Sequence, residues 1–89
     1  MAQWTFLTNH ALVLSFLARE PLITAHELSS QIGVTERAVR KIIADLDEQK
    51  YIAKRREGRR VRYKINSHMP LRHKTQHAIS VGELMRVLG

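Results

Sequence analysis

The chain has 89 residues, no cysteine and a formal net charge of +7. Its length supports one small domain, and hydrophobic residues make up 44% of it, which is ordinary for a globular protein. The lack of cysteine excludes disulfides, thiolate zinc sites and a cysteine nucleophile. The longest apolar run, Ala11–Leu14, is far shorter than the ~20 residues that span a bilayer, and no signal peptide is visible. We therefore expect a single cytoplasmic domain.

The positive charge is concentrated in one segment. Residues 54–64 contain seven basic side chains and one acid, Glu57, whereas the other 78 residues contain eight basic and seven acidic side chains. A local positive patch on an otherwise balanced domain is typical of a protein that binds a polyanion. A surface that served only solubility would have dispersed charges of both signs.

Two helices are expected in the first third of the chain. Apolar residues recur at helical spacing over residues 7–18, with Thr5 or Thr8 as the N-cap, and Pro21 ends this helix. The short apolar stretch 22–23 is interpreted as a single β-bridge. Residues 24–27 (Thr-Ala-His-Glu) then form a capping box, which begins a second helix.

The second helix is expected to end at Gly33, the residue best able to adopt the left-handed conformation, and Thr35 caps a third helix. At 100° per residue, the apolar side chains of the third helix fall within about 140° of arc. These are Ala38, Val39, Ile42, Ile43 and Leu46. The opposite side is cationic and ends in the small Ala44, which suits a helix in the DNA major groove. A merely solvated basic face is the alternative.

After Tyr51 the apolar period changes from 3.6 to 2, which predicts a hairpin over residues 52–65. Val61, Tyr63 and Ile65 alternate with basic residues, and the pair 57–58 (Glu-Gly) supplies the turn. We expect one apolar, packed face and one face lined with arginine. Such a hairpin projects from a helical core as a wing.

A domain of residues 1–66 is expected to be followed by a basic connection and a C-terminal helix in residues 67–89. Residues 80–83 (Ser-Val-Gly-Glu) form a second capping box, so the last helix is expected to run from Val81 to Leu88. This helix has more apolar surface than two turns can hide. It must pack on the first helix or on a second subunit.

This order of elements resembles a winged helix-turn-helix of the MarR-like regulator type. The resemblance is carried by TAHELSSQIGVTERAV (residues 24–39) and YIAKRREGRRVRY (residues 51–63). It implies a mainly α fold with a small β-hairpin: a three-helix core, a two-stranded wing and a short C-terminal helix. It also implies a transcriptional regulator that binds double-stranded DNA sequence-selectively, usually as a homodimer on a near-palindrome.

Two features depart from the family pattern. Many relatives have glycine where this chain has Lys50, so we expect a less tight turn before the wing. Full-length relatives also have long flanking helices that form a dimer and a ligand pocket. This chain has few residues for that role, so we expect no large effector pocket and no cofactor.

The candidate interface residues fall into two groups. In the major groove we assign Arg37, Arg40 and Lys41 to base edges, because an arginine fork fits guanine O6 and N7. Glu36 is a candidate for accepting from a cytosine amino group, and the alternative is that it only complements the helix dipole, as an N-terminal glutamate more often does. The candidates for phosphates or the flanking minor groove are Thr24, His26, Thr35, Arg55, Arg56, Arg59, Arg60, Arg62 and Lys64.

Three other functions are alternatives to DNA binding. A winged helix can instead bind a protein or RNA, although positive charge on both the third helix and the wing favours DNA. A metal-responsive repressor resembling the ArsR group would use His68, His73 and His77, but no cysteine or nearby acid completes a ligand set, so no metal is expected. The acids at residues 45–48 have no partner base and no glycine-rich phosphate loop, so we expect no enzyme.

Overall fold

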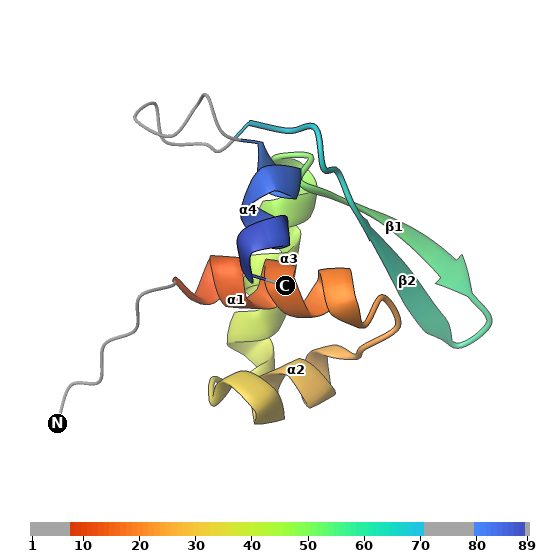
Figure 1. Ribbon diagram of the computed structural model, residues 1–89. Coiled ribbons are helices and arrows are strands. Elements are labelled where there is room, and N and C mark those ends of the chain that lie inside the picture. The colour runs from red at the N-terminus through yellow and green to blue at the C-terminus, as the bar shows by residue number, and fades with distance from the viewer. Residues whose placement is uncertain (1–7, 71–79, 89) are drawn as a thin grey trace, which may run out of the picture.

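The computed structural model describes residues 8–70 and 80–88 of the chain. These contain four helices and one two-stranded antiparallel sheet (Figure 1). The elements are α1 (Asn9–Arg19), α2 (Ala25–Ile32), α3 (Glu36–Glu48), β1 (Ile52–Glu57), β2 (Arg60–Ile65) and α4 (Val81–Leu88). A helical core with a projecting hairpin confirms the predicted winged helix-turn-helix fold.

The helices begin where short-range capping predicts. The hydroxyls of Thr8 and Thr35 each accept a hydrogen bond from the backbone N–H three residues later, at 3.2 and 3.0 Å. Both bonds of the Thr24–Glu27 capping box are present, at 2.9 and 3.1 Å. The hydrogen bonds from Thr24 lower the pKa of Glu27, so this box contributes most above the ordinary carboxylate pKa and weakens as the pH falls through the lowered value.

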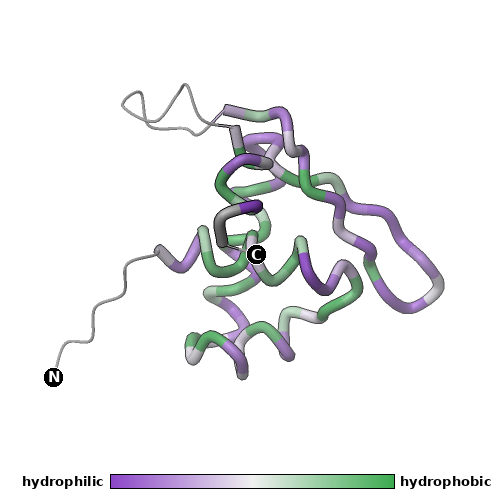
Figure 2. The backbone as a smooth tube through the Cα atoms, viewed as in Figure 1, coloured by the Kyte–Doolittle hydropathy of each residue, from purple (hydrophilic) through white to green (hydrophobic). Residues whose placement is uncertain are grey.

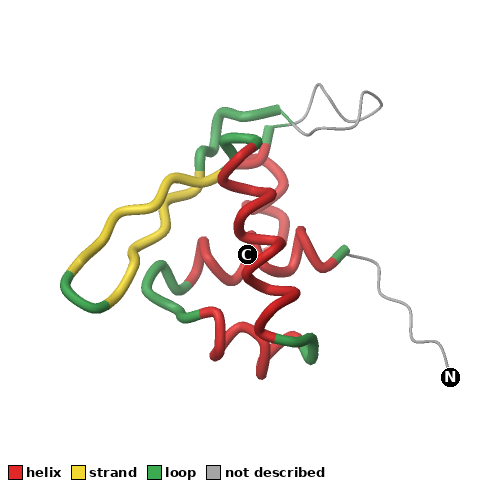
Figure 3. The backbone as a smooth tube through the Cα atoms, turned by 180° about the vertical axis from the view of Figure 1, so that it is seen from behind, coloured by secondary structure: helices red, strands yellow, loops and turns green. Residues whose placement is uncertain are grey.

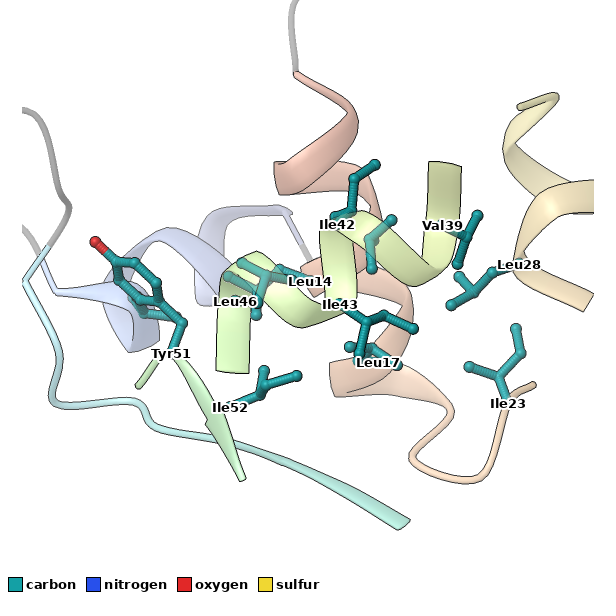
Figure 4. Close-up of a cluster of buried hydrophobic side chains, with 12 residues drawn as sticks. Leu14, Leu17, Ile23, Leu28, Val39, Ile42, Ile43, Leu46, Tyr51 and Ile52 are labelled. Carbon is teal, nitrogen blue, oxygen red and sulfur yellow. The ribbon is translucent and has the colours of Figure 1, made fainter. Parts of the chain in front are cut away.

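One core joins the helices and the base of the hairpin. Val13 and Leu17 of α1, Leu28 of α2 and Val39 of α3 are fully buried, and they meet in the cluster of Figure 4. This packing presses α1 against one side of α3. Seen from behind, in Figure 3, α3 crosses in front of α1, whereas α4 and α1 lie in front of α3 in Figure 1. One long side of α3 is therefore left facing solvent.

The hairpin differs from its prediction in two details. Glu57 pairs with Arg60, so the turn consists of Gly58 and Arg59 and begins one residue later than predicted, with Gly58 at φ 62°. A positive φ at the first of two turn residues suits glycine and matches the right-handed strand twist. Arg56 pairs with Val61 and therefore lies on the same face as the apolar side chains of β2, so the arginines do not all line one face.

The stretch Leu22–Ile23 does not form the predicted β-bridge. The backbone contact between this loop and the hairpin is instead a single hydrogen bond, from the N–H of Tyr63 to the carbonyl of Pro21 at 2.8 Å. Proline has no N–H to return to the strand, which limits the pairing here to one bond. The hairpin edge is thus fixed to the loop between α1 and α2.

The last helix packs on the first. Val81 is fully buried in the core, and Met85 packs against it. The N–H groups of Val81 and Gly82 donate to the carbonyls of Met69 and Ser67, at 2.7 and 2.8 Å. A Cβ on Gly82 would lie 2.9 Å from that of Ser67, so only glycine permits this approach. Of the two predicted partners for this helix, the first helix is the one found in the structure.

The expectation of a looser turn at Lys50 is wrong. Lys50 adopts φ 65°, and its N–H donates to the carbonyl of Asp47 while the N–H of Tyr51 donates to that of Leu46, at 3.0 and 2.9 Å. These two bonds are the Schellman pattern, in which the left-handed residue is usually glycine. The turn is as tight as with glycine, and the lysine adopts a conformation that L side chains disfavour.

Replacing Lys50 with glycine is therefore expected to stabilise the fold. Relief of the left-handed strain exceeds the extra backbone entropy of glycine, for a gain of about 0.5–1 kcal/mol or about 2–8 °C in Tm. Thermal unfolding followed by circular dichroism measures it. Gln49→Gly is the control, because Gln49 has φ −85° and glycine there should lower Tm. A Tm for Lys50→Gly at or below that of the wild type would contradict this account.

Candidate nucleic-acid interface

The solvent-facing side of α3 is formed by five residues, which we call the outward face. They are Arg37, Arg40, Lys41, Ala44 and Glu48, and all are exposed. The first four are the predicted stripe. Glu48 was not included in it, although it follows Lys41 by seven residues and so continues the same line along the helix. The cationic face is therefore confined to the first half of α3 and ends in a carboxylate.

Arg40 is part of a three-residue chain at the start of α3. Its Nε and Nη2 both donate to Oε2 of Glu36, at 3.2 and 2.7 Å. The other oxygen of Glu36 lies 3.3 Å from Nδ1 of His26, which belongs to α2. The hydrogen bond from Arg40 is the main cause that lowers the pKa of Glu36. Glu36 is thus an ionised carboxylate with a partner on each oxygen.

Lys41 is part of a matching chain on the other side of the outward face. Its Nζ lies 2.6 Å from Oδ1 of Asp45, and Oδ2 of Asp45 lies 2.9 Å from Nε2 of His10 in α1. The hydrogen bond with Asp45 raises the pKa of Lys41, and the bonds from Lys41 and His10 lower that of Asp45. The (i, i+4) spacing of Lys41 and Asp45 was the signal that could have found this pair.

Arg37 differs from Arg40 and Lys41, the other two cations of the outward face. Within residues 8–70 and 80–88, its side chain has no ion pair and no hydrogen bond. On the helical projection it lies between Arg40 and Lys41, about 60° from one and about 40° from the other. The centre of the outward face is therefore a guanidinium whose donors are not engaged by any residue that the structure describes.

The hairpin arginines also divide into bound and available groups. Nη1 of Arg60 donates to the carbonyl of Leu22 at 3.1 Å, and Nε of Arg62 donates to Oε2 of Glu57 at 2.9 Å. Nε of Arg56 donates to the carbonyl of Gly58 at 3.3 Å. Among the described residues, no such partner is found for the exposed side chains of Arg55, Arg59 and Lys64. Figure 2 shows the hydrophilic character of both strands toward the tip of the hairpin.

The remaining predicted contacts lie at helix N-termini. Thr24 and Thr35 use a hydroxyl oxygen to cap α2 and α3, which leaves the hydroxyl proton free to donate. His26 is 80% exposed at its side chain and lies beside Glu36, so the start of α2 is joined to the start of α3. Backbone N–H groups and a hydroxyl donor at a helix N-terminus suit a phosphate oxygen.

The described residues give no support to a metal site or to a membrane-spanning helix. Within the described part of the chain, no group of three or more histidines and acids is close enough to hold a metal ion. Of the three histidines weighed for a metal site, His68 is exposed, while His73 and His77 lie outside the described residues. None of the helices that the structure describes is both long and apolar enough to cross a membrane.

A helix-turn-helix with a cationic hairpin defines the class of winged-helix proteins, and comparisons specify the family. The model of the MarR family matches residues 5–60. This protein therefore belongs to the MarR family, a family of transcriptional regulators and not of enzymes. It is similar to the crystal structure of the predicted DNA-binding transcriptional regulator from E. coli, with a TM-score of 0.58 and 25% identity over 86% of this chain and 74% of that chain. No curated protein matches the chain.

Proposed function

We propose that this protein is a transcriptional regulator that binds double-stranded DNA sequence-selectively. The outward face of α3 enters the major groove, and the hairpin lies on the adjacent backbone or minor groove. The observation that carries this proposal is the presence, on both elements, of exposed guanidinium groups that have no partner among the described residues, namely Arg37 on α3 and Arg55 and Arg59 on the hairpin. Family membership supports it, because winged helices of regulators use these two elements on DNA.

Affinity and selectivity come from different groups in this proposal. Phosphate contacts by the hairpin cations, and by Thr24, Thr35 and His26 at the helix N-termini, supply most of the affinity. Arg37, Arg40 and Lys41 contact base edges and supply selectivity. Arg60 and Arg62 contribute less than their number suggests, because each already has a partner within the protein. Arg60 helps to hold the hairpin against the loop at Leu22, Arg62 binds within the hairpin, and both keep a positive potential near the duplex.

We further propose that the protein acts as a cytoplasmic, nucleoid-associated homodimer. Leu84 of α4 and Phe16 of α1 are only half-buried and so leave apolar surface exposed. The helices α4 and α1 themselves lie on the side of α3 that faces the viewer in Figure 1. A homodimer would place two copies of α3 on a near-palindromic site. Sedimentation analysis at tens of micromolar, with and without DNA, tests this point. A strict monomer in both conditions would contradict it.

Fluorescence anisotropy tests the function as a whole. A duplex chosen by selection from a randomised library is titrated at two salt concentrations, beside a scrambled duplex of the same length. We expect salt-sensitive binding to both and clearly tighter binding to the selected duplex. Equal binding to both would indicate an architectural or RNA-associated role, and no binding near physiological salt would indicate a protein partner. Either result would overturn the proposal.

The hairpin cations are expected to set the salt dependence. If about six phosphates are neutralised per subunit, log K falls with log salt at a slope of roughly −5. Replacing Arg55 and Arg59 together by alanine removes two available cations, so the slope should shift by about 2 and selected and scrambled duplexes should weaken alike. Lys54→Ala is the control, because Lys54 is 3.6 Å from Asp47 and already shares its charge. A double variant with an unchanged slope would exclude the hairpin from the interface.

A further inference from the structure

We propose that Arg40 reads a guanine and that Glu36 is a positioning residue for it, held in turn by His26, and not a reader of cytosine. This inference rests on the proposed binding of DNA. It replaces the base contact predicted for Glu36 and assigns one base pair of the recognised site to one side chain.

The Arg40 guanidinium has two hydrogen-bonding edges. Glu36 occupies one of them, so only the other edge can bind a base. Nε and Nη2 both point at a single carboxylate oxygen, at 3.2 and 2.7 Å, so the side edge of the group is occupied. Nη1 and the second hydrogen of Nη2 remain on the end edge. This edge is a two-donor fork, and guanine presents two acceptors, O6 and N7, at matching spacing in the major groove.

Glu36 itself is poorly available to a base. One oxygen accepts from Arg40 and the other lies 3.3 Å from Nδ1 of His26, so both are engaged within the protein. To accept from a cytosine amino group, Glu36 would have to give up one of these partners. Its position in the first turn also suits a carboxylate that complements the helix dipole. The chain His26–Glu36–Arg40 therefore limits the rotamers of Arg40 and lowers the entropic cost of a bidentate contact.

The pair on the other side of the outward face provides an internal comparison. Lys41 is held by Asp45, and Asp45 by His10, in the same order of cation, acid and histidine. An ammonium group has three rotating donors and no planar fork, so fixing its position does not select two acceptors at a set spacing. A stronger preference for guanine is therefore expected at the base pair that faces Arg40 than at the one that faces Lys41.

A double-mutant cycle on base preference tests the inference. Wild type, Arg40→Ala, Glu36→Ala and the double variant are each bound to a randomised duplex library, and discrimination at every base pair is compared. Total affinity is a poor readout, because removing the Glu36 carboxylate also reduces repulsion from phosphates. We expect Arg40→Ala to lower discrimination at one guanine by about 10- to 100-fold. Glu36→Ala should lower it several-fold at the same base pair, with no further loss in the double variant.

Two more variants separate positioning from general charge. Arg40→Lys keeps the charge and the salt slope but removes the fork, so it should lose the guanine preference. Asp45→Ala removes an acid of the matching chain and should leave that preference intact. If Glu36→Ala relaxes a different base pair, or if its effect adds fully to that of Arg40→Ala, Glu36 reads a base itself and the inference is wrong. If the wild type shows no base preference at all, the proposed function fails instead, and the inference with it.

Discussion

Arg37→Ala is expected to weaken binding to the selected duplex by about 10- to 100-fold, the largest loss of total affinity of any single replacement on the outward face. A bidentate contact between arginine and a base is worth about 1–3 kcal/mol of discrimination. Arg37 has no partner within the described residues to compete for its donors, whereas Arg40 and Lys41 each have a carboxylate. Anisotropy titrations with selected and scrambled duplexes measure the effect.

The effect of Arg37→Ala should be specific to sequence as well as large. Binding to the scrambled duplex should weaken only by the loss of one charge, so the ratio between the two duplexes should fall. Arg86→Ala is the matched control, since Arg86 is an exposed arginine on a different helix, α4, which lies in front of α3 in Figure 1. If Arg37→Ala and Arg86→Ala lowered the affinity for the selected duplex equally, Arg37 would not contact a base in the major groove.

Leu28→Ala is expected to destabilise the protein by about 2–5 kcal/mol, enough to unfold a large part of a domain of this size at 37 °C. Leu28 is the buried residue of α2 and is fully inaccessible to solvent. It joins α2 to Leu17 of α1 and Val39 of α3, and its removal leaves a cavity that short helices cannot close (Figure 4). Urea unfolding followed by circular dichroism measures the loss.

Loss of DNA binding should accompany Leu28→Ala only through unfolding. At a temperature where the variant is still folded, its affinity for the selected duplex should approach that of the wild type. Ser30→Ala is the control, because Ser30 is exposed on the same helix and surface replacements usually change stability by less than about 0.5 kcal/mol. A stability change for Leu28→Ala close to that of Ser30→Ala would mean that α2 is not anchored through this residue.

The helices could be predicted from the sequence because the interactions that fix their ends and their buried faces are local. The caps at Thr8, Thr24, Thr35 and Ser80 each involve groups three residues apart, and all four are present. The inward stripe of α3 followed from helical periodicity alone, and its core members are buried. The last helix begins and ends at the predicted residues, Val81 and Leu88. In each case the interactions that decide the structure lie within one or two turns of chain.

Only part of the hairpin could be predicted from the sequence. The alternation of apolar and basic residues in β2 predicted the strand, but β1 has no such alternation, and its arginines could not be assigned to a face from sequence. Their faces depend on register, and a shift of one residue at the turn moves every side chain of a strand to the other face. The turn at Gly58–Arg59 settled this, and it placed Arg56 opposite Val61.

The ranking of the cations was decided by local spacing and tertiary structure together. In the sequence, Arg37, Arg40 and Lys41 are three similar charges on one helix face. The carboxylates that hold Arg40 and Lys41 lie four residues away on α3 itself, but each is held in turn from another helix. His26 of α2 contacts Glu36, and His10 of α1 is 35 residues from Asp45. Such contacts depend on how helices pack, which no local pattern encodes. The sequence thus determined which surface is cationic and which of its cations have a carboxylate four residues away, and the packed structure determined which of these pairs are held from a second helix.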